Sequence, residues 1–548
     1  MSKIEKNIID LVRKSVKKVF PEDSGKVLSN SYLEIPKESR FGDFSTNIAM
    51  RLTKIVKKPP QDIAASIVSE INTSGAVLET SIKEIKIERP GFINFYLSDK
   101  AVTAALKEVI TSGSNFGRSL SGKGKKIQIE FVSANPTGPL TVAHGRQAAV
   151  GDSLARILEF CGYQVVREYY VNDEGVQMGI LGESVKSRYM ESVGEKACFP
   201  EDGYKGDYIY EIANGIKDAK GKQAIADNFF LEYAYKWIMA TIKKDLEDFG
   251  VDFDVWYSQK KLSESGKIEK VFHTLKKKGF LYEKDGATWF KSTEFGDDKD
   301  RVVVKKDGSL TYLGPDIAYH KEKFEKGYER IINIWGPDHH GYINRVKAAC
   351  QALGFDKDAL SILISQLVTL YRDQKPVKMS TREGEFITLR EVLDEVGKDA
   401  ARFFFMMRRT DSHLDFDLGL AKSKTMDNPV YYIQYAYARI SSVVKFSGGA
   451  RADLKNLGAL DKPEEICVIK ELMRFPKIIE TSARNLEPYV LLSYLQDLAS
   501  LFHSYYDAHR IVTDDKNLTG ARLALVGALK DVLFSGLTLL GVSAPEKM

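Results

Sequence analysis

The stretch Ser133-Ala-Asn-Pro-Thr-Gly-Pro-Leu-Thr-Val-Ala-His-Gly-Arg146 decides the fold of this 548-residue chain. It follows the alternating segment 126–132, which predicts a β-strand, and precedes an apolar-striped segment that predicts a helix closing near Gly162. A helix that begins after a Gly/Pro loop offers free backbone N–H groups and a positive dipole end to a phosphate. The loop lacks the three spaced glycines of dinucleotide sites and the Gly-Lys-Ser/Thr of Walker loops. The stretch therefore predicts nucleotide chemistry of another kind, with His144 on the first helical turn.

Length and composition limit the class of protein. The chain is long enough for about three or four domains of roughly 100–200 residues each, and 43% hydrophobic with 28% charged residues is ordinary for a soluble protein. No segment approaches the roughly 18 uninterrupted apolar residues of a membrane span. The net charge of +5 is too small to diagnose a nucleic-acid-binding protein. The four cysteines lie far apart, which argues against zinc knuckles and disulfide frameworks and favours the cytoplasm.

Three units with different patterns follow one another along the chain. Residues 1–108 predict a small α+β domain, and a glycine-rich linker is expected at 109–124. Residues 125–425 alternate strands and helices, which predicts a Rossmann-like parallel-sheet catalytic domain, interrupted by a charged insertion at about 185–300. Residues 426–548 are almost wholly helical and predict an all-α bundle. The expected strands of the parallel sheet are 127–132, 164–171, 330–335 and 361–370.

Polar residues follow three of these expected strands. In an open parallel sheet, ligands bind beyond the carboxyl ends of the strands. The first strand leads into the His144 loop, the strand 330–335 into Asp338-His-His340, and the strand 361–370 into a basic loop that begins at Lys375. A phosphate-binding loop, carboxylates and a basic loop are therefore predicted to meet in one cleft.

Two motifs resemble the signatures of class I aminoacyl-tRNA synthetases. Thr141-Val-Ala-His144 looks like the HIGH signature, and Lys378-Met379-Ser380 looks like the KMSKS signature. Flanking residues along essentially the whole chain are similar to the arginyl-tRNA synthetase family in particular. These are Glu130-Phe-Val-Ser-Ala-Asn135, Tyr170-Val-Asn-Asp173, Trp335-Gly-Pro-Asp338, Asp415-Phe-Asp-Leu418, Asn428-Pro-Val-Tyr431 and Leu540-Gly-Val-Ser543.

The resemblance implies an enzyme that joins L-arginine to tRNA(Arg) with ATP, through an arginyl-adenylate, and releases AMP and pyrophosphate. It implies a monomer in the cytoplasm that uses Mg²⁺ together with ATP, binds no membrane and has no metal cage of its own. The N-terminal domain would contact the tRNA, and the C-terminal bundle would bind the anticodon. A carboxylate site rejects neutral analogues of arginine by roughly 10⁴ or more, so the insertion at 185–300 is not interpreted as an editing domain.

The resemblance also assigns roles to individual residues. The catalytic residues would be His144, Lys378, Ser380 and Arg382, which meet the phosphates of ATP and the departing pyrophosphate. The ATP site would further contain Pro136, Thr137, Gly138, Thr141, Gly145 and Met379. A guanidinium calls for planar carboxylate partners, and the residues that would hold arginine are Glu130, Ser133, Asn135, Tyr312, Asp316 and Asp338.

Three positions depart from the family's signatures, and the first is Ala143, which stands where the family usually has glycine. Thr141 stands where the family usually has histidine, and Thr381 stands in place of the second lysine, whose charge Arg382 would supply from the next position. Two alternatives therefore stay open: a synthetase for another amino acid, and a tRNA-binding protein that has lost catalysis.

Some residues also have a purely structural interpretation. Pro315-Asp316 is a favourable helix start, and Thr388-Leu-Arg-Glu391 predicts a capping box. One helical face of the bundle carries Asn428, Tyr432, Tyr435 and Arg439, and its aromatic residues suit either core packing or stacking on RNA bases.

Overall fold

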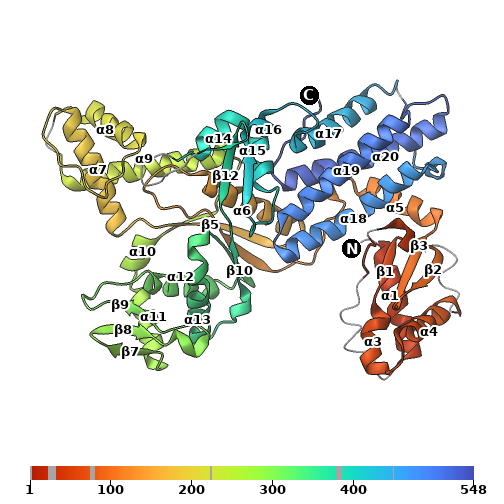
Figure 1. Ribbon diagram of the computed structural model, residues 1–548, viewed down its shortest axis with the longest axis horizontal. Coiled ribbons are helices and arrows are strands. Elements are labelled where there is room, and N and C mark those ends of the chain that lie inside the picture. The colour runs from red at the N-terminus through yellow and green to blue at the C-terminus, as the bar shows by residue number, and fades with distance from the viewer. Residues whose placement is uncertain are drawn as a thin grey trace.

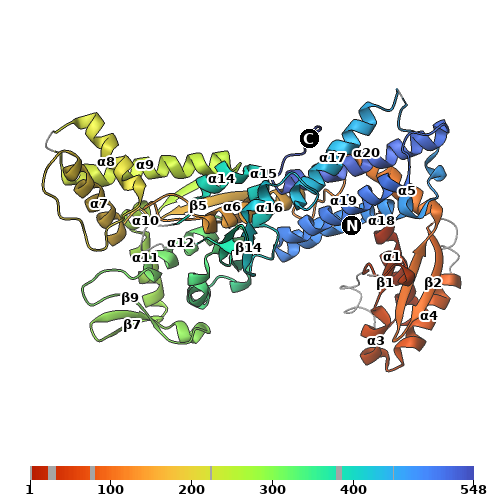
Figure 2. The ribbon, with the colours of Figure 1, turned by 45° about the horizontal axis from the view of Figure 1, so that its top comes forward.

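The molecule is elongated, with a parallel sheet near its middle (Figure 1). This computed structural model describes residues 3–21, 33–36, 38–73, 81–222, 225–377, 386–448 and 450–548. Two lobes project from one side of the sheet, while a helical bundle and the N-terminal domain lie at the other end, as the turned view in Figure 2 also shows. Within those described ranges, no helix has the length and apolarity that a membrane crossing requires.

The N-terminal domain is a three-stranded antiparallel sheet covered by helices. Its first helix buries the apolar stripe of Ile4, Ile8, Val12 and Val16, since these side chains recur at helical spacing. The strand order is β1-β3-β2. The elements are α1 (Lys3–Val19), β1 (Phe44–Thr46), α3 (Ile48–Val56), α4 (Pro60–Thr73), β2 (Ile82–Glu88) and β3 (Phe92–Leu97).

The central sheet has five parallel strands in the order β11-β10-β4-β5-β6. By their place in the chain, the strands run 5-4-1-2-3, which is the Rossmann order and confirms the predicted fold class. The chain leaves β4 toward one edge and β10 toward the other, so the carboxyl ends of β4 and β10 form the switch point where ligands bind. The strands are β4 (Lys126–Glu130), β5 (Gln164–Val171), β6 (Val255–Ser258), β10 (Arg330–Trp335) and β11 (Leu360–Ile364).

The expected strand 361–370 is wrong as a single element. It divides into β11 and β12 (Val368–Arg372), and β12 belongs to a separate sheet with β13 (Lys375–Pro376) and β14 (Leu414–Asp417). The break occurs because the backbone between them finds other partners. The amide of Ser365 donates to the carbonyl of Trp335 (2.8 Å), and the carbonyl of Gln366 accepts from Arg146 (2.9 Å).

Residues 185–300 contain β6, which is an edge strand of the main sheet and which their charged pattern did not indicate. The remainder forms the two lobes of Figure 1. The helices α7 (Val176–Ser192), α8 (Asp207–Lys220) and α9 (Asp227–Asp248) make one lobe. The other contains α10 (Gln259–Glu264), α11 (Lys267–Lys277), β7 (Leu281–Lys284), β8 (Ala287–Phe290) and β9 (Arg301–Val304).

Helices cover both faces of the central sheet. Ile129 of β4 belongs to the core that contains α6, whereas Glu130, the next residue, contacts α12 on the opposite face. This alternation follows from the two-residue repeat of a strand. The covering helices are α6 (Val142–Phe160), α12 (Leu313–Glu325) and α13 (Ile343–Leu353).

The C-terminal part is helical, as predicted, and is fastened to the sheet domain by a buried ion pair. Arg402, fully buried, donates to Asp152 of α6 (2.6 Å) and to the carbonyl of Leu540 (3.0 Å). The helices are α14 (Leu389–Val396), α15 (Lys398–Phe405), α16 (Leu418–Lys422), α17 (Pro429–Lys445), α18 (Pro463–Asn485), α19 (Pro488–Ala508) and α20 (Lys516–Leu539).

The stretch between the N-terminal domain and β4 packs against this bundle. Helix α5 (Asp99–Ser112) precedes it. Ser535 of α20 donates its hydroxyl to the carbonyl of Ser114 (3.1 Å), and the ring of Phe116 stacks on Phe475 of α18 at 6.3 Å. The residues expected to form a linker therefore make defined contacts with the bundle.

Candidate active site

The N-terminus of α6 presents a neutral histidine. Thr141 precedes the helix, and its amide donates to Nδ1 of His144 (3.1 Å). Since Nδ1 accepts, the ring proton of the neutral imidazole lies on Nε2. Burial lowers the pKa of His144 to about 4, although the charge of Asp338 opposes this shift. At neutral pH, His144 can therefore donate one hydrogen bond to a phosphate without carrying charge.

Gly145 lets the start of α6 approach α14 and α15 closely. A Cβ atom on Gly145 would lie 2.8 Å from Leu389 Cδ1 and 3.0 Å from Phe405 Cε2. The amide of Leu389 also donates to the carbonyl of Leu140 (2.7 Å). The capping box predicted at Thr388 and Glu391 is confirmed and opens α14. Helix α14, which follows the Lys378–Ser380 signature in the chain, is therefore packed against the start of α6, which carries the His144 signature.

The residues of the second signature, Lys378, Met379, Ser380, Thr381 and Arg382, lie outside the described residues. The described chain reaches Val377, whose amide donates to the carbonyl of Leu370 (2.8 Å), and resumes at residue 386. Their predicted roles stay predictions.

The loop before α6 is held by a tyrosine from the α7–α9 lobe. Tyr208 of α8 donates its hydroxyl to the carbonyl of Thr137 (2.7 Å), and a Cβ atom on Gly138 would lie 3.2 Å from that hydroxyl oxygen. Pro136 is buried. Sequence reasoning missed Tyr208 because it lies in a charged region about 70 residues beyond the loop.

Glu130, at the end of β4, is buried and already surrounded by donors. Its Oε2 accepts from the ammonium of Lys323 and from the hydroxyl of Tyr319 (3.1 Å), and its Oε1 accepts from Ser133 (3.2 Å). Burial alone would raise the pKa of Glu130, but Lys323 holds it below its usual value. Glu130 is therefore a charged, oriented acceptor whose negative charge is already balanced.

Asp316, in the first turn of α12, is a half-buried carboxylate that lacks, among the described residues, the kind of ion pair Glu130 forms with Lys323. Burial and the negative charge of Glu130 raise its pKa to about 7, while the hydroxyl of Tyr342 and the ammonium of Lys323 lower it. Within the described part of the chain, no arginine or lysine forms an ion pair with Asp316. A cationic ligand would supply the missing partner.

The other predicted arginine-binding residues take different places. Ser133 belongs to the Glu130 cluster and also accepts from the amide of Tyr170 (3.1 Å). Asn135 is exposed and donates to Gln177 (2.8 Å), and Tyr312 is 73% exposed. Asp338 is exposed near His144, and its carboxylate lies 3.4 Å from His339.

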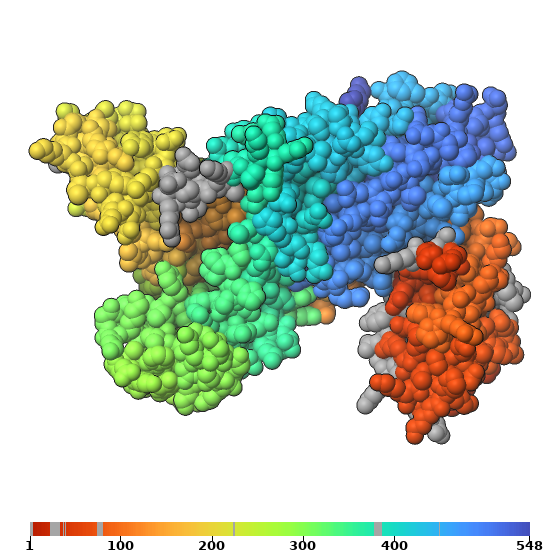
Figure 3. Space-filling view, in the orientation of Figure 1, coloured from red at the N-terminus to blue at the C-terminus, as the bar shows by residue number. Residues whose placement is uncertain are grey.

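The structure thus forms two groups at the carboxyl edge of the sheet, reaching it from opposite faces. The first contains Glu130, Ser133 and Asp316, and the second contains Thr141, His144 and Asp338. Figure 3 shows the surface hollowed between the α7–α9 lobe and the β7–β9 lobe on this side of the molecule. A cation and an anion could be held together across this edge.

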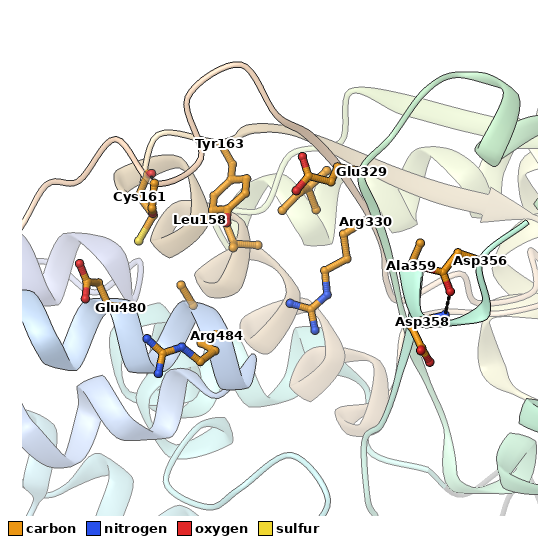
Figure 4. Close-up of a pocket in the computed structure, with 13 residues that line it drawn as sticks. Leu158, Cys161, Tyr163, Glu329, Arg330, Asp356, Asp358, Ala359, Glu480 and Arg484 are labelled. Carbon is orange, nitrogen blue, oxygen red and sulfur yellow. Dashed lines mark hydrogen bonds between the residues drawn. The ribbon is translucent and has the colours of Figure 1, made fainter. Parts of the chain in front are cut away.

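A cavity of about 550 Å³ lies elsewhere, at the amino ends of β4 and β10 and against α18. Figure 4 shows Arg330 at the centre of its lining, between Arg484 and Asp358. Because the cavity lies at the opposite edge of the sheet from His144 and Asp316, it is separate from the candidate active site.

No group of three or more His, Cys, Asp or Glu side chains in the described ranges could hold a metal ion.

Three sequence families match successive parts of the chain. The tRNA synthetases class I (R), catalytic domain, matches residues 105–415, the DALR anticodon binding domain matches 433–548, and the arginyl tRNA synthetase N-terminal domain matches 6–97.

Relatives of similar length indicate the same family. The arginine–tRNA ligase of Desulfosudis oleivorans is 50% identical over 531 residues, covering 94% of each chain. That of Geobacillus thermodenitrificans is 46% identical and covers 99% of this chain and all of the relative. The solved Thermus thermophilus arginyl-tRNA synthetase has the same fold, with a TM-score of 0.79 at 21% identity, over 99% of this chain and all of the other. The chain belongs to the arginyl-tRNA synthetase family.

Proposed function

We propose that this protein is an arginine–tRNA ligase that activates L-arginine with ATP and transfers it to tRNA(Arg), releasing AMP and pyrophosphate. The family assignment and the full-length relatives support the activity. The single structural observation that carries it is Asp316, a half-buried carboxylate without an ion-pair partner in the described residues, at the Rossmann switch point.

We propose the following roles in activation. The guanidinium of the substrate arginine pairs with Asp316 and is oriented by the carboxylate of Glu130. Asn135 and Asp338 hold the α-amino and carboxylate groups of the same arginine. This brings the arginine carboxylate to the α-phosphate of ATP, and pyrophosphate leaves. Holding two reactants in line supplies much of the rate of such phosphoryl-type reactions.

The ATP site is proposed at the N-terminus of α6. His144 donates Nε2–H to a phosphate, and Pro136, Thr137, Gly138, Thr141 and Gly145 form the surrounding backbone. Lys378, Met379, Ser380 and Arg382 are proposed to neutralise the departing pyrophosphate. Mg²⁺ would enter with ATP, because the described residues contain no cage of their own for it.

tRNA binding is proposed to use both ends of the molecule. The N-terminal domain, about 1–108, would contact the tRNA body, and the helical domain, about 426–548, would bind the anticodon. A cavity of about 480 Å³ in the helical domain is lined by Tyr435, Arg439 and Tyr506. The guanidinium of Arg439 lies 4.1 Å from the centroid of Tyr506, a stacking platform of the kind that RNA bases use.

The protein is further proposed to be a cytoplasmic monomer, with a linker at about 109–124 and a catalytic domain at about 125–425. Gel filtration with light scattering would test the monomer, since a dimer would have twice the mass of 61.6 kDa.

The experiment that tests the function is a charging assay that offers each of the twenty amino acids with bulk tRNA. We expect arginine alone to be charged, and the Asp316→Asn variant to charge it far more slowly. Charging of another amino acid would favour the first alternative, a synthetase of different specificity. Absence of any ATP consumption with arginine and tRNA would favour a tRNA-binding protein without catalysis.

A further inference from the structure

Lys323 lies at the centre of a buried polar network behind the carboxylates. Its side chain is fully buried, and its ammonium contacts Oε2 of Glu130 and donates to Oδ1 of Asn333 (3.0 Å). Asn333 pairs with Glu130 across β10 and β4, so the sheet register brings these two side chains together, and α12 adds Lys323. The ammonium also lies 4.2 Å from the ring centroid of Tyr319. Lysine is almost never fully buried unless it is paired, so its partner is a strong constraint.

The remaining bonds run outward from Lys323, which donates to Glu130 on one side and to Asn333 on the other. Nδ1 of His320 lies 2.8 Å from the carbonyl of Asp316 and must donate to it, so Nε2 accepts from the amide of Asn333 (2.9 Å). The carbonyl oxygen of Asn333 then faces Lys323 and accepts from it. Every member thus has a defined donor or acceptor role, and the chain of bonds links the backbone at Asp316 to the carboxylate of Glu130.

Other elements contribute ionisable groups to the same region. Tyr319 donates to Glu168 (2.6 Å), and Lys326 lies 3.8 Å from that carboxylate. Lys323 is the cation that contacts Glu130 itself. Among the described residues, the ionisable groups that interact with Glu130, Asp316 or Lys323 are Tyr170 from β5, Tyr319 and His320 from α12, Cys350 from α13, and Tyr342. Glu168 and Tyr257 contact Tyr319 in turn, and Lys326 lies beside Glu168.

We propose that Lys323 is a positioning residue for arginine recognition, which balances and orients Glu130 so that Asp316 is left to balance the guanidinium. This inference rests on the proposed function of the two carboxylates. With Lys323 in place, the pair of carboxylates carries a net charge of −1, which matches one guanidinium. Without it, Glu130 is a buried carboxyl group without its lysine partner, and burial then favours the neutral form of Glu130 as it already does that of Asp316.

The number of protons released when arginine binds measures this charge balance. With Glu130 already paired, arginine displaces at most one proton, the one on Asp316. Without Lys323, both carboxylates hold protons in the free enzyme, and arginine displaces more than one. A purely structural lysine would change stability and leave this number the same.

The test is calorimetric titration of the full-length protein with arginine, in buffers of different ionisation enthalpy, at several values of pH between about 5.5 and 8.5. For the wild type we expect proton release that never exceeds one per arginine. A wild-type value clearly above one would overturn the proposal without any variant, so a variant that fails to fold does not remove the test.

Variants extend the test. In Lys323→Gln we expect more than one proton released, and the midpoint of the profile of arginine KM against pH should rise by about one pH unit. Lys323→Arg keeps the cation and should restore the wild-type profile. Thermal unfolding checks that each variant is folded. An unchanged profile in folded Lys323→Gln would refute the positioning role.

The proposed function is tested separately with Asp316→Asn. If this variant binds arginine as well as the wild type does, the carboxylate site itself is wrong. If it loses arginine binding while Lys323→Gln behaves like the wild type, only the inference about Lys323 fails.

Discussion

Replacing Asp316 with asparagine is expected to stabilise the free protein and to remove arginine recognition. The pKa of Asp316 is about 7, against an ordinary value of 3.8. At 1.36 kcal/mol per pH unit, its charged form costs at most about 4 kcal/mol of folding free energy. Contact with solvent and the favourable N-terminus of α12 reduce this cost, so we expect a gain of about 2 kcal/mol in the variant.

The stability gain of Asp316→Asn over the wild type should increase as the pH rises. The folded protein binds the Asp316 proton more tightly than the unfolded chain does, so the wild type loses stability as pH rises from about 4 to about 7. Asparagine does not titrate. The variant should therefore exceed the wild type in free energy of unfolding at pH 8, by less at pH 6, and not at all near pH 4.

The Asp316→Asn variant should lose aminoacylation activity although it gains stability. Removing one partner of a desolvated ion pair costs about 3 kcal/mol, which lowers kcat/KM for arginine by about two orders of magnitude. The KM for ATP should stay the same, since the ATP site is proposed at the N-terminus of α6 and Asp316 belongs to α12.

Urea unfolding at pH 4, 6 and 8, together with aminoacylation kinetics, measures both effects. Asp338→Asn is the matched control for stability, because Asp338 is an exposed carboxylate at the same edge of the sheet. Its free energy of unfolding should change by less than about 0.5 kcal/mol. If Asp316→Asn were less stable than the wild type at pH 8, the ionised Asp316 would have a stabilising cation in the native protein, which would refute the expected gain.

Three further predictions follow from the contacts around α6. His144→Ala removes a donor to a charged phosphate, worth about 1.5–3 kcal/mol, so pyrophosphate exchange should slow by about 10- to 100-fold with arginine binding unchanged; an unaltered rate would exclude His144 from the ATP site. Gly145→Ala places a Cβ atom 2.8 Å from Leu389 and should lower the free energy of unfolding by about 1–3 kcal/mol. Gly179→Ala is the control, because a Cβ atom on this helical glycine has no neighbouring atom of the described residues within 4 Å, and it should not lower the stability. Equal losses of stability in the two variants would contradict the packing argument. Arg402→Met leaves the buried carboxylate of Asp152 without its 2.6 Å partner and should destabilise the protein by about 3–5 kcal/mol in urea unfolding; a neutral result would show that Arg156 and Arg167 suffice to pair that carboxylate.

Much of the fold could be predicted because local pattern and tertiary structure agree in it. The alternation before Ser133 and the stripe after it define β4 and α6, and the helical periodicity after Asn428 defines the bundle. The strand at 361–370 could not be divided correctly, because apolar residues lie on both sides of Ser365-Gln366 and two polar residues alone do not indicate a break. Its break depends on Arg146 and Trp335, which are distant in sequence. Strand β6 was missed because it is short and only half-buried at the sheet edge.

The candidate site was predicted in part for a similar reason. Glu130 and Asp316 follow from the motifs, and the structure places them in one cluster. Lys323 carries no signal in the sequence, because a lysine in a charged helical segment is normally solvated. Only the register of β10 against β4 and the turn of α12 bring it to Glu130. Its charge changes the chemistry of the site, since it divides two apparently equivalent carboxylates into one that is balanced and one that is not.

The most direct test of the central claim compares arginine with citrulline, its neutral isostere, as substrates for charging of tRNA(Arg). The claim is that Asp316 recognises the guanidinium by its charge. We predict a kcat/KM ratio of roughly 10⁴ or more in favour of arginine, and a ratio reduced by about two orders of magnitude in Asp316→Asn. A wild-type ratio near about 10, or a ratio that the variant leaves unchanged, would contradict it.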